Sequence, residues 1–76
     1  MAINEYDSVK TARDALNLVY DALQEKGYDP IAQLTGYILF EDPAYITPNR
    51  KARMIIGKFD RDDYLAELMN TYFAGR

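Results

Sequence analysis

The chain has 76 residues, a net charge of −3, and neither cysteine nor histidine. These counts exclude disulfides, thiolate metal sites and a cysteine nucleophile, and they remove the commonest metal ligand and general base. A domain of this size buries only about 60% of the surface that its unfolded chain exposes, so few contacts stabilise it. Because a partner subunit is one way to add contacts, we expect a homodimer with no metal and no cofactor.

The N-terminal segment, residues 1–7, carries acidic residues and no apolar run, so it does not resemble a signal peptide. We expect it to be a flexible tail in front of a single helical domain over residues 8–76. The longest apolar stretch, residues 37–40, is far too short to cross a bilayer. A cytoplasmic location without membrane insertion is therefore predicted.

The first long helix is predicted over residues 9–26, where apolar residues recur at helical spacing. Ser8 stands at the position of an N-cap, where its oxygen would accept from free amides of the first turn. At the other end, Gly27 is suited to the left-handed conformation that ends a helix. In such a Schellman cap, Tyr28 would pack back on Leu23.

Each of the three prolines follows a residue that is able to cap a helix, and proline is favoured at the first helical position because its missing N–H would be unpaired there. These pairs predict a helix over about 30–40, a single turn at 43–46 and a helix over about 48–58. The three pairs are Asp29-Pro30, Asp42-Pro43 and Thr47-Pro48.

The segment 30–40 has two possible structures. Gly36 costs a helix about 1 kcal/mol, and residues 35–38 could instead form a short strand. We expect the helix, with Gly36 allowing the close approach of another backbone. Its inward residues are then predicted to be Ile31, Leu34, Ile38 and Leu39.

The last helix is predicted over residues 61–74, with Asp60 as its cap. Asp62 and Asp63 fall in the first turn, where the helix dipole favours negative charge. We interpret these three clustered acids as structural, so no catalytic or metal-binding residues are predicted. The apolar stripe of this helix is wider than so small a chain can cover. Its members are therefore dimer interface candidates: Tyr64, Leu65, Leu68, Met69 and Tyr72.

Residues 47–61 hold five basic residues and one acidic residue, a net charge of +4 in an acidic protein. Arg50 and Arg53 would share one face of the predicted helix and would point, with its free amides, toward an anion or an acidic partner group. In the other interpretation these bases pair with acids of the same chain or of a second subunit. Tyr45 either anchors the preceding turn or lines a contact surface. The segment would also serve as the recognition helix of a nucleic-acid binder, although the acidic charge of the whole chain argues against it.

A run of residues from Val19 to Ile31 resembles the IreB family of regulatory phosphoproteins from Gram-positive bacteria. The resemblance extends over about residues 16–73. Its further matches are Gly36-Tyr37, Asp42-Pro43-Ala44-Tyr45-Ile46, Ala52-Arg53, Ile56, Arg61-Asp62 and Glu67-Leu68.

This resemblance implies an all-α fold of about four helices plus a short turn helix, arranged as an intertwined or side-by-side homodimer. It also implies a protein that is not an enzyme and is a substrate of a transmembrane Ser/Thr kinase with PASTA domains, acting in cell-wall stress and cephalosporin-resistance signalling. The family is phosphorylated on threonines of its N-terminal tail. Residues 1–7 contain neither serine nor threonine, so Ser8 and Thr11 are the phosphorylation candidates. A phosphate there is expected to order the helix start.

Overall fold

The computed structural model describes residues 5–76, which form helices and turns with no strand among them. The all-α prediction is confirmed, and the alternative strand over residues 35–38 is wrong, because a helix runs through that segment. The helices are α1 (Glu5–Ser8), α2 (Ala12–Glu25), α3 (Pro30–Phe40), α4 (Ala52–Ile56) and α5 (Arg61–Ala74), with two 3-10 turns, η1 (Pro43–Tyr45) and η2 (Asn49–Lys51).

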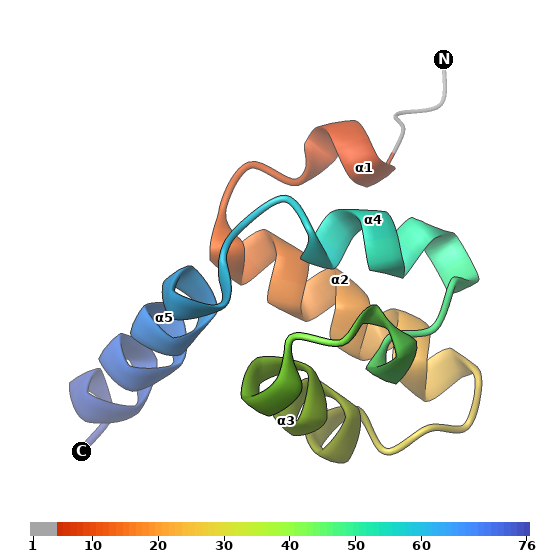
Figure 1. Cartoon of the computed structure of the whole chain (residues 1–76). Helices are drawn as coiled ribbons and strands as arrows, with labels where there is room; N and C mark the ends of the chain where they lie inside the picture. The colour runs from red at the N-terminus through yellow and green to blue at the C-terminus, as the bar shows by residue number, and fades with distance from the viewer. Residues whose placement is uncertain (1–4) are drawn as a thin grey trace.

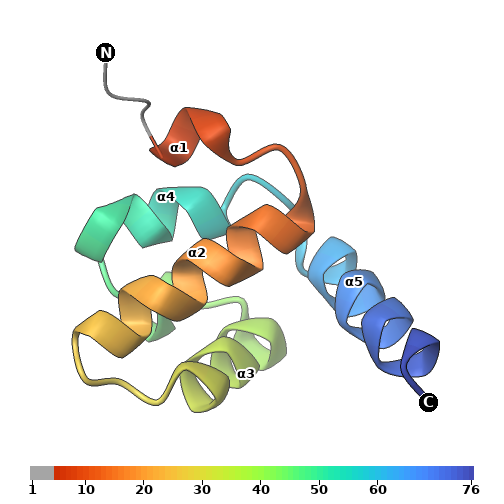
Figure 2. The same ribbon diagram turned by 180° about the vertical axis from the view of Figure 1, so that it is seen from behind.

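Helix α2 lies at the centre of the fold (Figure 1). Helices α1 and α4 lie on one side of it and α3 lies on the other, as the view from behind also shows (Figure 2). Helix α5 starts beside α2 and projects away from the other helices, ending at the C-terminus. The residues that α2 buries form the middle of the apolar core: Ala15, Leu16, Val19, Ala22 and Leu23.

The start of α2 differs from the prediction. Thr11, not Ser8, is its N-cap, and Thr11 Oγ1 accepts a hydrogen bond from the Asp14 amide at 3.1 Å. Asp14 Oδ2 in turn accepts from the Thr11 and Lys10 amides, which completes a capping box. Ser8 has no acidic residue three positions later, so Thr11 makes the better cap, and α2 begins at Ala12.

The end of α2 follows the prediction. Gly27 has φ +81°, in the left-handed region where glycine is favoured. The Tyr28 amide donates to the Leu23 carbonyl at 3.1 Å and the Gly27 amide donates to the Gln24 carbonyl at 3.0 Å. These two bonds define a Schellman motif.

The expected tail is partly helical. Residues 5–7 belong to α1, and Ser8 ends that helix with its hydroxyl donating to the Glu5 carbonyl at 2.8 Å. The rest of the expected tail, residues 1–4, lies outside the described residues.

Helix α3 begins as predicted, with Asp29 Oδ1 accepting from the Ile31 amide and Pro30 at the first helical position. The predicted inward face is wrong at Ile31 and Leu39, which are 63% and 64% exposed. The face that carries Gly36 and Tyr37 is buried instead.

Gly36 explains this rotation of α3. A Cβ on Gly36 would lie 2.4 Å from the Tyr45 ring, so only glycine lets this ring rest against the helix. The prediction that another backbone approaches Gly36 is wrong, because the group in close contact is a side chain, the Tyr45 ring. Because η1 follows directly after α3, the Tyr45 ring sets which face of α3 turns inward.

The helix predicted over 48–58 is interrupted. Arg50 and Lys51 have φ of 55° and 58°, both in the left-handed region, and α4 starts only at Ala52. The Asn49 side chain donates to the Ala22 carbonyl at 3.0 Å and to Glu25 Oε1 at 3.1 Å. These contacts with α2 accompany the non-helical backbone of η2. The residues around Asn49 contain no sequence pattern that predicts them.

Candidate interaction surface

Helix α5 carries five large apolar side chains that are exposed in the single chain. These side chains are between 40% and 69% exposed. We call the surface that they form the α5 face, and it consists of Leu65, Leu68, Met69, Tyr72 and Phe73. Four of the five predicted interface residues therefore lie together on the surface of the single chain.

Tyr64 is the exception. Its side chain is 0% exposed, its ring meets Phe59 edge-on with centroids 6.2 Å apart, and its hydroxyl donates to the Ile56 carbonyl. Burial raises the pKa of this hydroxyl, so it remains a donor at neutral pH. Tyr64 thus fastens the first turn of α5 to the core and has no surface left for a second chain.

The α5 face continues into an apolar groove between α2, α3 and α5. The groove has a volume of about 300 Å³ and is bordered by three helices at once. Leu68 contributes to both the groove and the α5 face, so the two surfaces are continuous. Its apolar lining residues are Leu16, Tyr20, Ile31, Leu34, Ile38 and Leu68.

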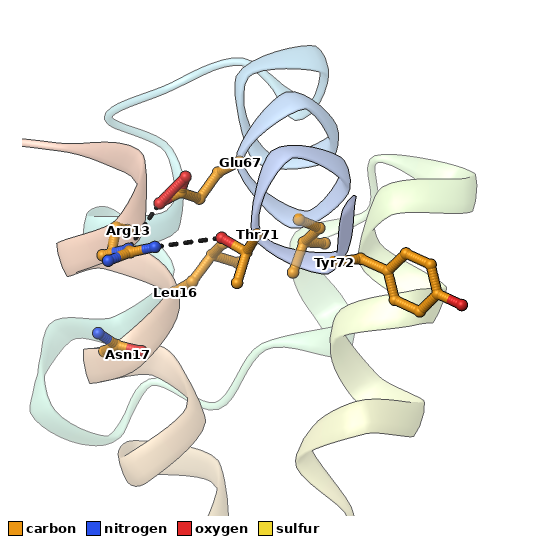
Figure 3. Close-up of a pocket in the computed structure, with 7 residues that line it drawn as sticks. Arg13, Leu16, Asn17, Glu67, Thr71 and Tyr72 are labelled. Atoms are coloured by element: carbon orange, nitrogen blue, oxygen red, sulfur yellow. Dashed lines mark hydrogen bonds and ion pairs between the residues drawn. The ribbon is translucent and has the colours of Figure 1, made fainter. Parts of the chain in front are cut away.

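A second hollow of about 580 Å³ lies on the polar side of Leu68, between α2 and α5 (Figure 3). Arg13 crosses it, with Nε 2.7 Å from Glu67 Oε1 and Nη2 3.1 Å from Thr71 Oγ1. Through these two contacts, the exposed side chain of Arg13 joins α2 to the middle of α5.

Arg50 and Arg53 do not converge as predicted. Arg50 lies in the left-handed region, so it does not share a helical face with Arg53. Its guanidinium bonds both carboxylate oxygens of Glu5, at 2.7 and 3.0 Å, and reaches Glu25 Oε2 at 2.7 Å. These bonds raise the pKa of Arg50 and lower that of Glu5. Arg53 Nε donates to the Ile46 carbonyl at 2.7 Å.

Two more cations of the basic segment also have partners within the chain. Lys58 Nζ donates to the carbonyls of Tyr6 and Val9, at 2.7 and 2.8 Å. Arg61 lies 3.6 Å from Glu41. Four of the five basic residues, all but Lys51, are thus bonded to acidic side chains and carbonyls of the same chain, and the nucleic-acid alternative gains no support.

Tyr45 anchors its turn. Its ring rests on Gly36 and stacks with Phe40 at 5.9 Å between centroids, while its carbonyl accepts from Gln33 Nε2 at 2.8 Å. The side chain is half-buried and borders a shallow hollow of about 310 Å³. Its predicted role as a contact residue stays a prediction.

Both phosphorylation candidates are exposed. Thr11 caps α2, whereas Ser8 lies at the C-terminal end of α1 and not at a helix start. Ser8 shares a hollow of about 280 Å³ with Arg50 and with the acidic residues Asp14 and Asp21. The two hydroxyls therefore lie in different electrostatic surroundings.

Over residues 5–76 the structure contains no cluster of acidic side chains arranged to hold a metal ion, and none of its helices has the length and apolar character that a bilayer crossing requires. The described residues form a small helical domain, and its main candidate for a functional site is the α5 face with the adjoining groove. The chain belongs to the IreB family, since the family model described as IreB regulatory phosphoprotein matches residues 1–74. The resemblance inferred from the sequence is confirmed, and the protein has a regulatory role.

Proposed function

We propose that the chain is a non-enzymatic regulatory protein that works as a homodimer joined through the α5 face and is controlled by phosphorylation near α1. The observation that carries this proposal is the α5 face itself. An α-helix of 14 residues buries only Tyr64 and leaves its other large apolar side chains in water. Exposed apolar surface of this kind marks interaction sites in small proteins.

A second copy is the partner that we propose for this face. In a closed dimer the same patch covers itself, so a single apolar helix surface is sufficient for both subunits. The groove beside Leu68 offers a place for apolar side chains of the facing α5. Because α5 projects from the other helices, two copies can meet side by side without disturbing α2 and α4 (Figure 1).

The kinase in this proposal is the Ser/Thr kinase with PASTA domains that the family resemblance implies, and it modifies Ser8 or Thr11 in the cytoplasm. Membership of a family of regulatory phosphoproteins supports this step. The chain would then act in cell-wall stress and cephalosporin-resistance signalling by binding an unknown protein target.

The two hydroxyls should respond differently to phosphate. A phosphate on Thr11 would lie at the N-terminus of α2, where the dipole favours negative charge, although the Asp14 carboxylate in the same turn already accepts from the Thr11 amide. A phosphate on Ser8 would lie at the C-terminal end of α1 in a hollow with Asp14 and Asp21, which would repel it. Arg50 lines the same hollow, and a phosphate would draw it away from Glu5 of α1. Phosphorylation of Ser8 should therefore loosen α1, in contrast to the ordering expected from the sequence.

The test is to incubate the purified chain with the kinase's catalytic domain and map phosphate by mass spectrometry. Ser8→Ala and Thr11→Asn should each remove one site, and asparagine preserves the cap because its side chain also accepts hydrogen bonds from the first turn. Phosphate found on neither residue would refute the assignment.

A further inference from the structure

Helix α1 is held to the domain by two cations and by the partly buried side chain of Tyr6, which packs against the core. Arg50 bonds both carboxylate oxygens of Glu5, and Lys58 Nζ bonds the carbonyls of Tyr6 and Val9. The same Lys58 Nζ lies 4.3 Å from the centre of the Tyr6 ring. None of the residues of α1 is buried. A short helix with few apolar contacts and no buried residue opens at a smaller cost in free energy than the core helices do.

Arg50 is held in place by the rest of the domain, independently of α1. Glu25 of α2 binds Arg50 Nη1 at 2.7 Å, and Asn49 fixes the preceding backbone on α2. Arg50 and Lys51 both keep left-handed backbone angles, which cost a residue with a side chain about 1–2 kcal/mol each. Such strain persists only where surrounding contacts enforce it, and it often marks a functional position.

We propose that Arg50 and Lys58 form a binding site, here called the cationic site, for an acidic segment of a partner protein, and that α1 is its internal occupant. The partner segment would offer a carboxylate to Arg50, and an aromatic ring and backbone carbonyls to Lys58, as α1 does through Glu5 and Tyr6. Binding of the partner would displace α1, so α1 would act as a built-in competitor.

The contact chemistry favours a peptide over other anions. Arg50 presents a planar fork that bonds both oxygens of one carboxylate. Lys58 is satisfied by two backbone carbonyls and an aromatic face, which a nucleic acid or a free phosphate does not supply together. The acidic side chain of Glu25 stays beside Arg50 and limits the charge that the site accepts.

The cationic site lies apart from the α5 face. Arg50 and Lys58 contact α1 and α2, whereas the α5 face consists of residues 65–73. The inference therefore requires neither dimerisation nor phosphorylation, and it can fail while the proposed function holds.

The test uses a fluorescent peptide with the sequence of residues 5–9, titrated into the full chain and followed by anisotropy. In Glu5→Gln the internal occupant is weakened, so the peptide should bind at least about tenfold more tightly than to the unchanged chain, because competition reduces the apparent affinity by the fraction of free site. Binding should weaken as salt is raised. A peptide with glutamine in place of its glutamate should bind at least about tenfold less tightly.

Two further substitutions are made in the Glu5→Gln chain. Arg50→Gln should abolish binding, and Arg50→Lys should weaken it because the fork is lost. The matched control is Arg13→Gln, since Arg13 also pairs with a glutamate, Glu67, but at α5. Circular dichroism verifies that each variant is folded, and Lys58→Met replaces Arg50→Gln if the latter unfolds.

The proposal is overturned if the peptide does not bind Glu5→Gln at millimolar concentration, or if Arg50→Gln and Arg13→Gln lower binding equally. It is also overturned if inorganic phosphate or duplex DNA displaces the peptide more effectively than an excess of unlabelled peptide does. Leu68→Asp, which alters only the α5 face, should leave the peptide affinity within about twofold.

Discussion

Helices α2 and α5 have the same length, 14 residues, and both carry apolar side chains at helical spacing, yet they lie in opposite environments. Helix α2 buries five residues and contacts α3, α4 and α5, whereas α5 buries Tyr64 alone. The two helices differ in how many neighbouring helices cover them, and not in whether their sequences form a helix. An apolar stripe predicts which face of a helix is favourable to bury. The tertiary structure determines whether other helices of the same chain cover that face.

The comparison separates what stabilises the monomer from what is available for binding. Removing side chains of α2, or the buried first turn of α5, should unfold the chain. Altering the rest of α5 should change association and leave the monomer folded. Four experiments test this division, from the largest expected effect to the smallest.

The largest effect is expected at Tyr64, where α5 belongs to the core. Tyr64→Ala removes a fully buried ring and its bond to the Ile56 carbonyl, and should lower the free energy of unfolding by about 3–5 kcal/mol. In so small a domain that loss is enough to unfold most molecules. The measurement is urea unfolding followed by circular dichroism.

Tyr72→Ala is the matched control on the same helix. Its side chain is the most exposed of the α5 face, so monomer stability should change by no more than about 0.5 kcal/mol. Equal destabilisation by the two substitutions would contradict the division between the two parts of α5.

The second experiment breaks the proposed dimer at Leu68. The side chain is 46% exposed in the single chain, so Leu68→Asp should leave the helix content intact. The dimer should weaken by about 2 kcal/mol or more, roughly thirtyfold in its dissociation constant. Sedimentation velocity over a range of concentrations measures this.

Asn70→Asp provides the control, because it adds the same charge on the opposite, polar side of α5. If both variants dissociate equally, net charge and not the α5 face governs association. A monomer at every concentration of the unchanged chain would dismiss the dimer itself.

The third experiment concerns the contact that orients α3. Gly36→Ala places a Cβ against the Tyr45 ring and should destabilise the chain by about 1–3 kcal/mol. At Gly57 a Cβ meets nothing closer than 3.5 Å, so Gly57→Ala should be nearly neutral. In a Tyr45→Ala background, Gly36→Ala should become stabilising by about 1 kcal/mol because alanine favours the helix. Thermal unfolding of the four variants gives the coupling, and additive effects would contradict the contact.

The smallest effect is expected at α1, the helix without buried residues. Arg50 lowers the pKa of Glu5 below its ordinary value of 4.5, so the pair stabilises the docked helix above that pH. As the pH falls through the lowered pKa, Glu5 takes up a proton and the contribution is lost. The amide-exchange protection of residues 5–8, relative to the intrinsic exchange rate at each pH, should then fall while that of α2 stays unchanged. An identical pH response in Glu5→Gln would exclude this carboxylate as the cause.

The predictions that held depend on a few neighbouring residues. Asp29 and Asp60 begin helices and Gly27 ends one, because a cap satisfies backbone groups within one turn of itself. The apolar stripe of α5 was also visible in the sequence. Its exposed members agree with the prediction because a helix period assigns them to one face.

The rest was decided by contacts between distant segments. The Tyr45 ring packs against Gly36, and in this orientation of α3 the side chain of Ile31 is exposed. Asn49 bonds the Ala22 carbonyl and Arg50 bonds Glu25, and the predicted helix is broken at these residues. Neither the contact of Tyr45 with Gly36 nor the contacts of η2 with α2 can be predicted from the pattern of polar and apolar residues.

By itself, the sequence determined that the chain is helical, where α3 and α5 begin and end, and that one helix carries more apolar surface than the chain can cover. Only the tertiary structure decided that Tyr64 belongs to the core and that the basic segment holds α1. The physical reason is range. Caps and periodicity act over three or four residues, whereas Arg50 reaches Glu5 across 45 positions of sequence and only the folded chain brings the two together.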